Sequence, residues 1–332
     1  MTRRIIFVTG GAGFIGSNIV AKLAEDPSLD VVVCDWLHEA ELGKWRNIAK
    51  HPIGDFVAPE SMFEWLEKRW RDVELVVHMG AVSSTTDPDA DKVVHSNFTL
   101  SRDLFRWCAD HQRRFIYASS AATYGDATDF EDRDDVDSLA GLRPLNTYGW
   151  SKALFDLFAA RQAARDYAPP QWVGLKFFNV YGPNEEHKHS MKSVASQIWP
   201  KVRDGHAVQL FKSYRDGVPD GGQSRDFVYV RDVADVVGWL AKNEQVSGIY
   251  NLGSGKARTF EDMAKAVFTA VGRTPEIEYT PMPPAIRDKY QYFTQAHMER
   301  LQAAGYNQPM TPLEEGVGDY VKRYLSQPDP YR

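Results

Sequence analysis

The sequence has little cysteine, no long hydrophobic run and no strong excess of charge of either sign. Its 332 residues include two cysteines, Cys34 and Cys108, too few for a disulfide framework, so we expect two reduced, buried thiols in a cytoplasmic protein. The net charge is −6, so no basic field predicts nucleic-acid binding. The apolar run at 5–8 is far too short for a signal peptide or a membrane span, and we expect neither.

What the sequence does contain is an alternation of short apolar runs with stretches of helical periodicity. The runs at 4–10, 29–36, 73–81, 113–120 and 172–180 predict strands, and the stretches at 14–26, 96–111 and 149–164 predict helices. The run at 73–81 is almost entirely apolar, which is typical of a parallel strand buried on both faces. This order predicts an α/β fold with a doubly wound parallel sheet of the Rossmann type.

The alternation loosens after Gly182 and predicts a second, smaller lobe. We expect a helix at about 190–204, a strand at 207–211 and a turn-rich polar loop at 212–224, because that stretch is rich in Gly, Pro and Asp. Residues 225–243 are expected to return to the main layer, followed by a strand at 249–255 and a helix at 259–272. We therefore predict a dinucleotide-binding domain at 1–182, with returning segments near 225–255. Residues 183–332 are expected to form mostly a smaller α/β C-terminal lobe that covers the ligand end of the sheet.

A glycine-rich turn lies between the first predicted strand and helix. Gly10, Gly13 and Gly16 are three residues apart, which lets the backbone approach a pyrophosphate at a helix N-terminus. Asp35 ends the next strand about 20 residues downstream, where a carboxylate can bind ribose hydroxyls. The context of strand, turn, helix and acidic residue predicts a dinucleotide site.

A candidate catalytic group comes from the end of a later strand and from the helix predicted after it. Ser119 and Ser120 end the strand at 113–120, and Tyr148 and Lys152 are four residues apart on a predicted helix, so they share one face. A nearby ammonium and an oxidised nicotinamide ring both favour phenolate. We expect Tyr148 to act as a general base near neutral pH, with Ser120 donating a hydrogen bond to the same substrate oxygen.

Several motifs together resemble a known family. The stretches TGGAGFIG, SSAATYG, YGWSK and FNVYGP are similar to those of the extended short-chain dehydrogenase/reductases that act on nucleotide sugars. The HK and SM pairs at 187–191, with RDFVYVRDVADV and YQYFTQA, resemble the ADP-heptose 6-epimerases within it. The resemblance implies that C6 of ADP-D-glycero-β-D-manno-heptose is inverted through a 6-keto intermediate, in the supply of a lipopolysaccharide core precursor. It also implies a homo-oligomer, a pentamer by analogy.

Inversion at C6 gives Lys188 a candidate role. A nicotinamide takes and returns hydride on one fixed side, so the ketone must rotate about its C5–C6 bond, and one acid/base group serves the two orientations poorly. By resemblance the two groups are Tyr148 and Lys188, whereas the residues alone leave open that Lys188 neutralises the ADP diphosphate. His187 and His189 flank this lysine without a Cys or carboxylate set at ligand spacing, so we expect no metal. The relatives usually have glycine in place of His189.

The cofactor is expected to be NADP, with NAD as the alternative. Asp35 favours NAD because a carboxylate repels a 2′-phosphate. The resemblance implies NADP, with Lys44 compensating, although a second lysine of the family pattern is replaced near Pro59. In addition to Gly10, Gly13, Gly16, Asp35 and Lys44, the residues expected to contact the cofactor are Phe14, Ile15, Trp36, Met79, Gly80, Ala81, Val82, Ser83, Asn97, Lys152, Val180 and Lys188.

Substrate contacts are expected from both lobes. By resemblance they are Ser84, Asn179, Ser190, Gln197, Phe211, Tyr214, Arg225 and Tyr290. Gln197 stands where the family often has histidine, and the loop at 212–224 is longer than the family pattern.

Three other functions remain open from the sequence. A 4,6-dehydratase usually has an acidic residue after the active Ser or Thr, whereas Ala121 and Ala122 follow Ser120. A hexose 4-epimerase is expected to lack Lys188. A redox-sensing module without catalysis is disfavoured by the intact Ser120, Tyr148 and Lys152.

Overall fold

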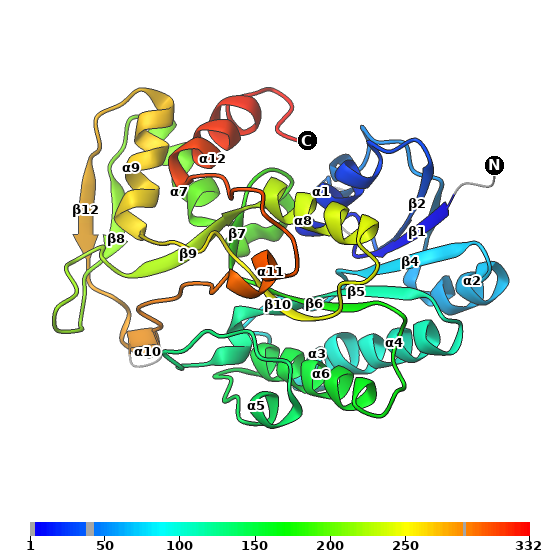
Figure 1. Ribbon diagram of the computed structural model, residues 1–332. Helices are drawn as coiled ribbons and strands as arrows, with labels where there is room; N and C mark the ends of the chain where they lie inside the picture. The colour runs from blue at the N-terminus through cyan, green and yellow to red at the C-terminus, as the bar shows by residue number, and fades with distance from the viewer. Residues whose placement is uncertain (1–3, 38–42, 288–289) are drawn as a thin grey trace.

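The computed structural model describes residues 4–37, 43–287 and 290–332, and at its centre is a parallel sheet of seven strands (Figure 1). In sheet order the strands are β10 (Gly248–Leu252), β6 (Trp172–Phe177), β5 (Arg114–Ser120), β4 (Val73–His78), β1 (Arg4–Thr9), β2 (Leu29–Cys34) and β3 (Asp55–Val57). All neighbouring pairs are parallel, which confirms the predicted doubly wound fold.

Helices cover both faces of this sheet, as Figure 1 shows. On one face α1 (Phe14–Leu23) packs against α8 (Val230–Lys242). The other face carries α2 (Met62–Arg69), α3 (Ala90–Val94), α4 (Leu100–Asp110), α5 (Val136–Ala140) and α6 (Thr147–Ala163), with a π-helical turn (His95–Thr99) between α3 and α4. The predicted helices at 14–26, 96–111 and 149–164 are thus confirmed.

The central strands are apolar on both faces because each face meets a helical layer. In β1, Ile6 and Val8 belong to the core cluster under α1 and α8, whereas Ile5 and Phe7 belong to the cluster under α2, α4 and α6. All four side chains are buried.

A second lobe lies beside the main sheet. It contains a sheet of β11 (Ala257–Thr259), β9 (Ser224–Tyr229) and β7 (Asn179–Tyr181), and a parallel pair of β12 (Ile277–Thr280) and β8 (Val208–Phe211). Its helices are α7 (Val194–Arg203), α9 (Phe260–Val271) and α12 (Leu313–Tyr320), with the short α10 (Pro284–Arg287) nearby (Figure 1). The short α11 (Glu299–Ala303) packs against β10 of the main sheet. The predicted strand at 207–211 and helix at 259–272 are confirmed.

Three expected elements differ in the structure. The strand predicted at 172–180 divides at Phe178, so that β6 stays in the main sheet and β7 pairs with β9. The segment 225–243 returns to the main layer only through α8, because β9 belongs to the small sheet. The helix expected at 190–204 begins at Val194, where the Ser193 side chain accepts a hydrogen bond from the Ser196 N–H as its N-cap.

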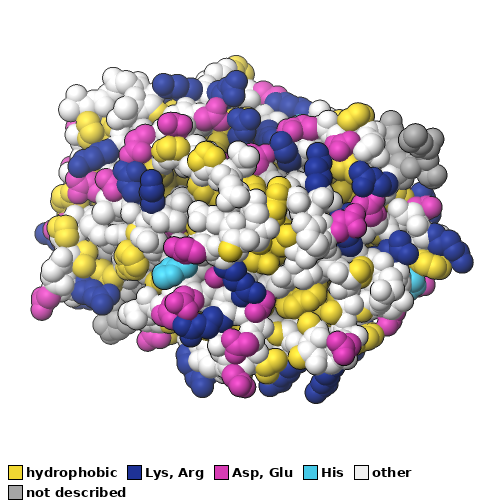
Figure 2. Space-filling view, viewed as in Figure 1, with side chains coloured by type: hydrophobic (Ala, Val, Ile, Leu, Met, Phe, Trp, Pro, Cys, Tyr) yellow, Lys and Arg dark blue, Asp and Glu magenta, His cyan; other side chains and the backbone are white. Residues whose placement is uncertain are grey.

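Parallel pairing brings the carboxyl ends of all seven strands to one edge of the main sheet. Thr9, Cys34, His78, Ser120 and Phe177 end β1, β2, β4, β5 and β6 there. In such sheets ligands bind at this edge. On the face of the molecule that Figure 2 shows, side chains of both charges are interspersed. Among the helices of the described ranges, none combines the length and apolar character needed to cross a membrane.

Candidate functional site

A cavity of about 680 Å³ opens at the carboxyl edge of the main sheet and is lined by residues from both lobes. Most of the residues predicted to contact a cofactor line it. These are Gly10, Gly13, Phe14, Ile15, Gly16, Asp35, Trp36, Lys44, Met79, Gly80, Ala81, Val82, Ser83, Lys152 and Lys188, together with Tyr148 and Ser84.

The glycine turn at one end of the cavity requires glycine for steric reasons. Gly10 has φ +64°, and a Cβ there would lie 2.6 Å from the Gly80 backbone nitrogen. A Cβ at Gly16 would lie 2.1 Å from the Gly10 carbonyl oxygen. The turn therefore lies close against Gly80, just after the end of β4, and leads directly into α1. Among the described residues no side chain caps the N-terminus of α1 at Gly13, so that the helix presents positive potential to the cavity.

The Asp35 carboxylate beside this turn accepts three hydrogen bonds. Its Oδ2 accepts a hydrogen bond from the Ala12 N–H at 2.9 Å, and its Oδ1 accepts one from the Trp36 N–H at 2.7 Å. Lys44 Nζ lies 2.6 Å from the same Oδ1 and also donates to the Trp36 carbonyl at 2.9 Å. Lys44 thus forms an ion pair with the Asp35 carboxylate.

Asn97 supports the cavity wall from behind. It is fully buried and outside the cavity lining; its Oδ1 accepts from the Val82 N–H at 2.8 Å and its Nδ2 donates to the Val82 carbonyl at 2.9 Å. The same amide donates to Ser151 Oγ at 3.0 Å, next to Lys152 on α6. Asn97 therefore positions the wall relative to α6 through these bonds.

Tyr148 and Lys152 lie in the first two turns of α6, where Asn146 is the N-cap and accepts from the Gly149 N–H at 2.8 Å. Lys152 Nζ donates to the Ala118 carbonyl at 2.8 Å, and burial lowers its pKa to about 8. Tyr148 is hydrogen-bonded to the Ser120 side chain, and burial raises the pKa of its phenol. We predicted a lowered pKa for Tyr148. When only the groups of the protein act on the phenol, this prediction is wrong, because the burial penalty on phenolate outweighs the Ser120 hydrogen bond. Ser120 itself is buried and does not belong to the cavity lining.

Lys188 reaches the same cavity from the second lobe. It lies in a 3-10 segment, Glu186–Met191, that follows β7, and its Nζ is 5.1 Å from the centroid of the Phe14 ring at the start of α1. Burial lowers the pKa of the Lys188 ammonium, and the nearby Glu185 carboxylate partly opposes this shift. A depressed pKa is what proton transfer near neutral pH requires of a lysine.

The backbone after Lys188 is strained. His189 has φ +48° and ψ −121°, a conformation that glycine adopts readily and other residues rarely. This agrees with the glycine that the resemblance implies at this position. Gln197 holds the segment by donating to the Ser190 carbonyl at 3.2 Å and to the Lys192 carbonyl at 2.6 Å.

The remaining substrate candidates divide into two groups outside the cavity lining. Asn179 and Ser190 are exposed, and Val180, expected to contact the cofactor, is partly buried. The other four candidates lie in the second lobe.

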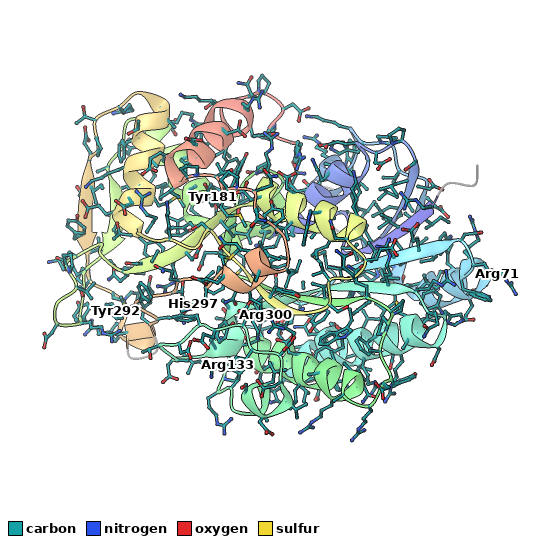
Figure 3. The ribbon with its side chains drawn as sticks, viewed as in Figure 1. Arg71, Arg133, Tyr181, Tyr292, His297 and Arg300 are labelled. Carbon is teal, nitrogen blue, oxygen red and sulfur yellow. The ribbon has the colours of Figure 1, made fainter. Side chains whose placement is uncertain are left out.

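Phe211, Tyr214, Arg225 and Tyr290 form an aromatic and cationic cluster. The Arg225 guanidinium carbon lies 5.3 Å from the centroid of the Tyr290 ring, which meets Phe211 edge to face at 6.3 Å. The Tyr214 N–H donates to Tyr292 Oη at 2.9 Å, and Figure 3 shows Tyr292 beside α10. The Tyr292 ring in turn meets the Tyr290 ring edge to face at 5.8 Å, so Tyr214 adjoins the other three predicted residues through Tyr292.

Thirteen cavity residues were not predicted. They are Thr9, Cys34, Pro59, Glu60, Met62, His95, Ser96, Leu100, Ala118, Ser119, Phe177, His187 and Met191. Those that end strands follow the rule for the carboxyl edge of the sheet, which was a usable signal. The others come from segments whose approach depends on tertiary packing. No group of three or more His, Cys, Asp and Glu side chains within the described ranges could hold a metal ion.

Comparison with known proteins adds family information to this geometry. The sequence profile of the NAD dependent epimerase/dehydratase family matches residues 6–253. The ADP-L-glycero-D-manno-heptose-6-epimerase of Nitratidesulfovibrio vulgaris is 46% identical over 327 residues, covering 98% of this chain and 99% of the relative. The crystal structure of Helicobacter pylori ADP-L-glycero-D-manno-heptose-6-epimerase is similar with a TM-score of 0.82 and 28% identity, covering 98% and 97%. Thermus thermophilus UDP-glucose 4-epimerase, in complex with NAD, has a TM-score of 0.70 and 27% identity, covering 95% and 96%.

Proposed function

Because the chain belongs to the NAD dependent epimerase/dehydratase family, and within it to the ADP-L-glycero-D-manno-heptose 6-epimerases, we propose that it inverts C6 of ADP-D-glycero-β-D-manno-heptose. The product is ADP-L-glycero-β-D-manno-heptose, formed through a 6-keto sugar. The observation that carries the proposal is that Tyr148 and Lys188, from different lobes, line one cavity beside a dinucleotide-binding turn.

The cavity residues fit a nicotinamide dinucleotide. Its phosphates and ribose would be held by the Gly10–Gly16 turn, by the segment 79–83 and by the start of α1, which no side chain among the described residues caps. When bound, the cofactor supplies the acceptor and then the donor of a hydride on one fixed side of the sugar. Lys152, held by the Ala118 carbonyl, places a positive charge near the same region.

Tyr148 and Lys188 divide the proton transfers between two orientations of the sugar. In one orientation Tyr148 exchanges a proton with the C6 oxygen, with Ser120 hydrogen-bonded to its phenol. The 6-keto group then rotates about C5–C6, and Lys188 exchanges the proton in the other orientation. The depressed pKa of Lys188 suits this role better than that of a permanent diphosphate counter-ion.

The cofactor of this proposal is NADP. An unpaired Asp35 carboxylate would repel a 2′-phosphate, whereas the ion pair with Lys44 removes that repulsion and leaves one ammonium proton available to an anion. Heat denaturation of the purified protein, followed by mass measurement of the released nucleotide, distinguishes NADP from NAD.

The decisive experiment follows epimer formation from ADP-D-glycero-β-D-manno-heptose by chromatography. We expect Tyr148→Phe and Lys188→Met each to lower turnover at least 100-fold while cofactor content is retained, because general acid–base groups contribute about 10²–10⁴-fold. Lys192→Met is the matched control, since Lys192 pairs with Glu186 outside the cavity. Full turnover by Lys188→Met would contradict the two-base scheme.

The same assay separates the competing functions. Wild-type protein that is as inert as Tyr148→Phe on every nucleotide sugar would favour a redox-sensing module. Dehydration or 4-epimerisation products would favour the other two enzyme classes.

The biological setting is part of the proposal. The product is a lipopolysaccharide core precursor made in the cytoplasm, and the second lobe with its Arg225 cluster binds the ADP part of the substrate. A homo-oligomer, a pentamer by family analogy, is proposed as the active form. Light scattering coupled to size-exclusion chromatography measures its mass directly.

A further inference from the structure

His187 lines the cavity, and no step of the proposed reaction uses it. It precedes Lys188 in the 3-10 segment of the second lobe. Its Nδ1 lies 3.2 Å from Nδ2 of Asn47, a fully buried residue of the segment that carries Lys44. The same Asn47 amide donates to the Ala12 carbonyl of the glycine turn at 2.8 Å. His187 is thus linked to the cofactor loop through one buried amide.

These contacts determine which nitrogen of His187 carries a proton. The Ala12 carbonyl can only accept, so the nitrogen of the Asn47 amide must face it. That nitrogen also faces His187 Nδ1, which must therefore accept, because two N–H groups cannot bond to each other. The proton of the neutral ring is then on Nε2. A second proton on Nδ1 would oppose the N–H of Asn47, so this geometry also disfavours the charged ring.

The surroundings of His187 are those of an anion site. It lines the cavity together with Phe14 at the start of α1, and with the ammonium groups of Lys44 and Lys188. Burial, followed by the charges of Lys44 and Lys188, lowers the pKa of His187 to about 4. The ring is therefore a neutral N–H donor in a region of positive charge, at a helix N-terminus.

We propose that His187 is a phosphate-binding residue that donates its Nε2–H to a phosphate oxygen of the bound dinucleotide, an inference that rests on the proposed function. Asn47 is its positioning residue, because the Asn47 amide holds Nδ1 in the acceptor state. Through Ala12, the same amide ties the loop that carries Lys188 to the cofactor turn. The phosphate is either the diphosphate or the 2′-phosphate.

The first test measures binding of NADP and of NAD by isothermal titration calorimetry to the full chain freed of resident nucleotide. We compare wild type with His187→Phe, which keeps a ring and removes the donor, and His187→Gln, which restores an N–H. His187→Phe is expected to weaken binding at least tenfold and His187→Gln less than about threefold, as for a hydrogen bond to a charged group. His206→Phe, at an exposed histidine outside the cavity, is the matched control.

The two ligands distinguish the two phosphates. Weaker binding of both assigns His187 to the diphosphate, and weaker binding of NADP alone assigns it to the 2′-phosphate. Unchanged binding of both by His187→Phe overturns the inference while leaving the proposed function intact. Wild-type protein that binds neither dinucleotide overturns both.

The second test reads the proton directly. In ¹⁵N-histidine-labelled protein at neutral pH, we expect the ¹⁵N shifts of His187 to show a protonated Nε2 and an unprotonated Nδ1. A ring protonated on Nδ1 contradicts the assignment, whatever the binding data show. A purely structural histidine would give no change in its Nε2 signal when the dinucleotide is added, whereas the proposed donor shifts it.

Discussion

A buried ion pair behind the catalytic strand gives the sharpest test of the energetics. Lys176 in β6 and Asp156 in α6 are 2.8 Å apart, and both side chains are 0% exposed. Lys176 Nζ also donates to Thr123 Oγ1 at 2.7 Å, and the Asp156 carboxylate accepts from Tyr117 Oη at 3.0 Å and Ser119 Oγ at 2.7 Å. Every polar group of the pair thus has a partner.

Asp156→Asn keeps the shape and removes one charge. The Lys176 ammonium is then left in a dry interior beside a neutral amide, and breaking a fully buried pair in this way costs about 3–5 kcal/mol of unfolding free energy. The double variant Asp156→Asn with Lys176→Met removes both charges and should recover more than half of that loss, because no uncompensated charge remains. Lys68→Met is the exposed control: its pair with Glu64 is about 70% exposed on both sides, so we expect a change below about 0.5 kcal/mol.

The assay is urea denaturation at pH 7, followed by far-ultraviolet circular dichroism and tryptophan fluorescence, with coincident transitions required for each variant. The reasoning predicts an order of stability: wild type and Lys68→Met together, then the double variant, then Asp156→Asn. A loss below about 1 kcal/mol for Asp156→Asn, or a double variant less stable than the single one, would refute it.

Three further predictions concern the cofactor, the strained loop and a buried histidine. Lys44→Met leaves Asp35 without its ion pair and should weaken NADP binding at least tenfold more than NAD binding, as measured by calorimetry. An unchanged ratio of the NADP and NAD affinities would count against the role of Lys44. His189→Gly should raise the unfolding free energy, measured in urea, by about 1 kcal/mol, because glycine adopts the backbone conformation of residue 189 without strain. Gln112→Gly, also at positive φ, is the comparison outside the site. A His189→Gly variant less stable than wild type would contradict the claim that the backbone is strained at His189. Burial lowers the pKa of His78 to about 3, so between about pH 6.5 and 3 the unfolded chain binds the extra proton and stability falls as the pH falls. His78 alone should account for a loss of about 2 kcal/mol of unfolding free energy from pH 7 to pH 5. The measurement is urea denaturation of wild type and His78→Gln at both pH values. Identical pH dependences of the two proteins would exclude this contribution.

The sequence predicted best those parts of the site that are local. The turn from β1 into α1 is encoded by Gly10 and Gly16, which no other residue can replace without meeting backbone atoms. Tyr148 and Lys152 share one face of α6 because of helical spacing alone, and the structure places both in the cavity. Periodicity and glycine positions carry this information without knowledge of distant contacts.

Features that depend on packing between distant segments were beyond the sequence. Burial in the folded protein raises the pKa of Tyr148, whereas the sequence pattern predicted the opposite direction. His187 was seen only as one of a pair flanking a lysine, because its partner Asn47 is 140 residues away. Likewise, no periodicity marks the approach of Pro59 and Glu60 to the cavity.

The break at Phe178 explains how Lys188 comes to line the same cavity as Tyr148. Ser120 pairs with Phe177 at the ends of β5 and β6, so Ser120, which is hydrogen-bonded to Tyr148, and the end of β6 are direct neighbours at the sheet edge. After Phe178, whose N–H donates to the Leu252 carbonyl, the chain leaves the main sheet and pairs with β9 through β7. Had β6 continued straight, the following segment would extend past the edge of the sheet. The switch of sheets instead directs the 3-10 segment back over α1, where Lys188 contacts Phe14. Two residues 40 positions apart in sequence therefore line one cavity because a strand changes partners between them.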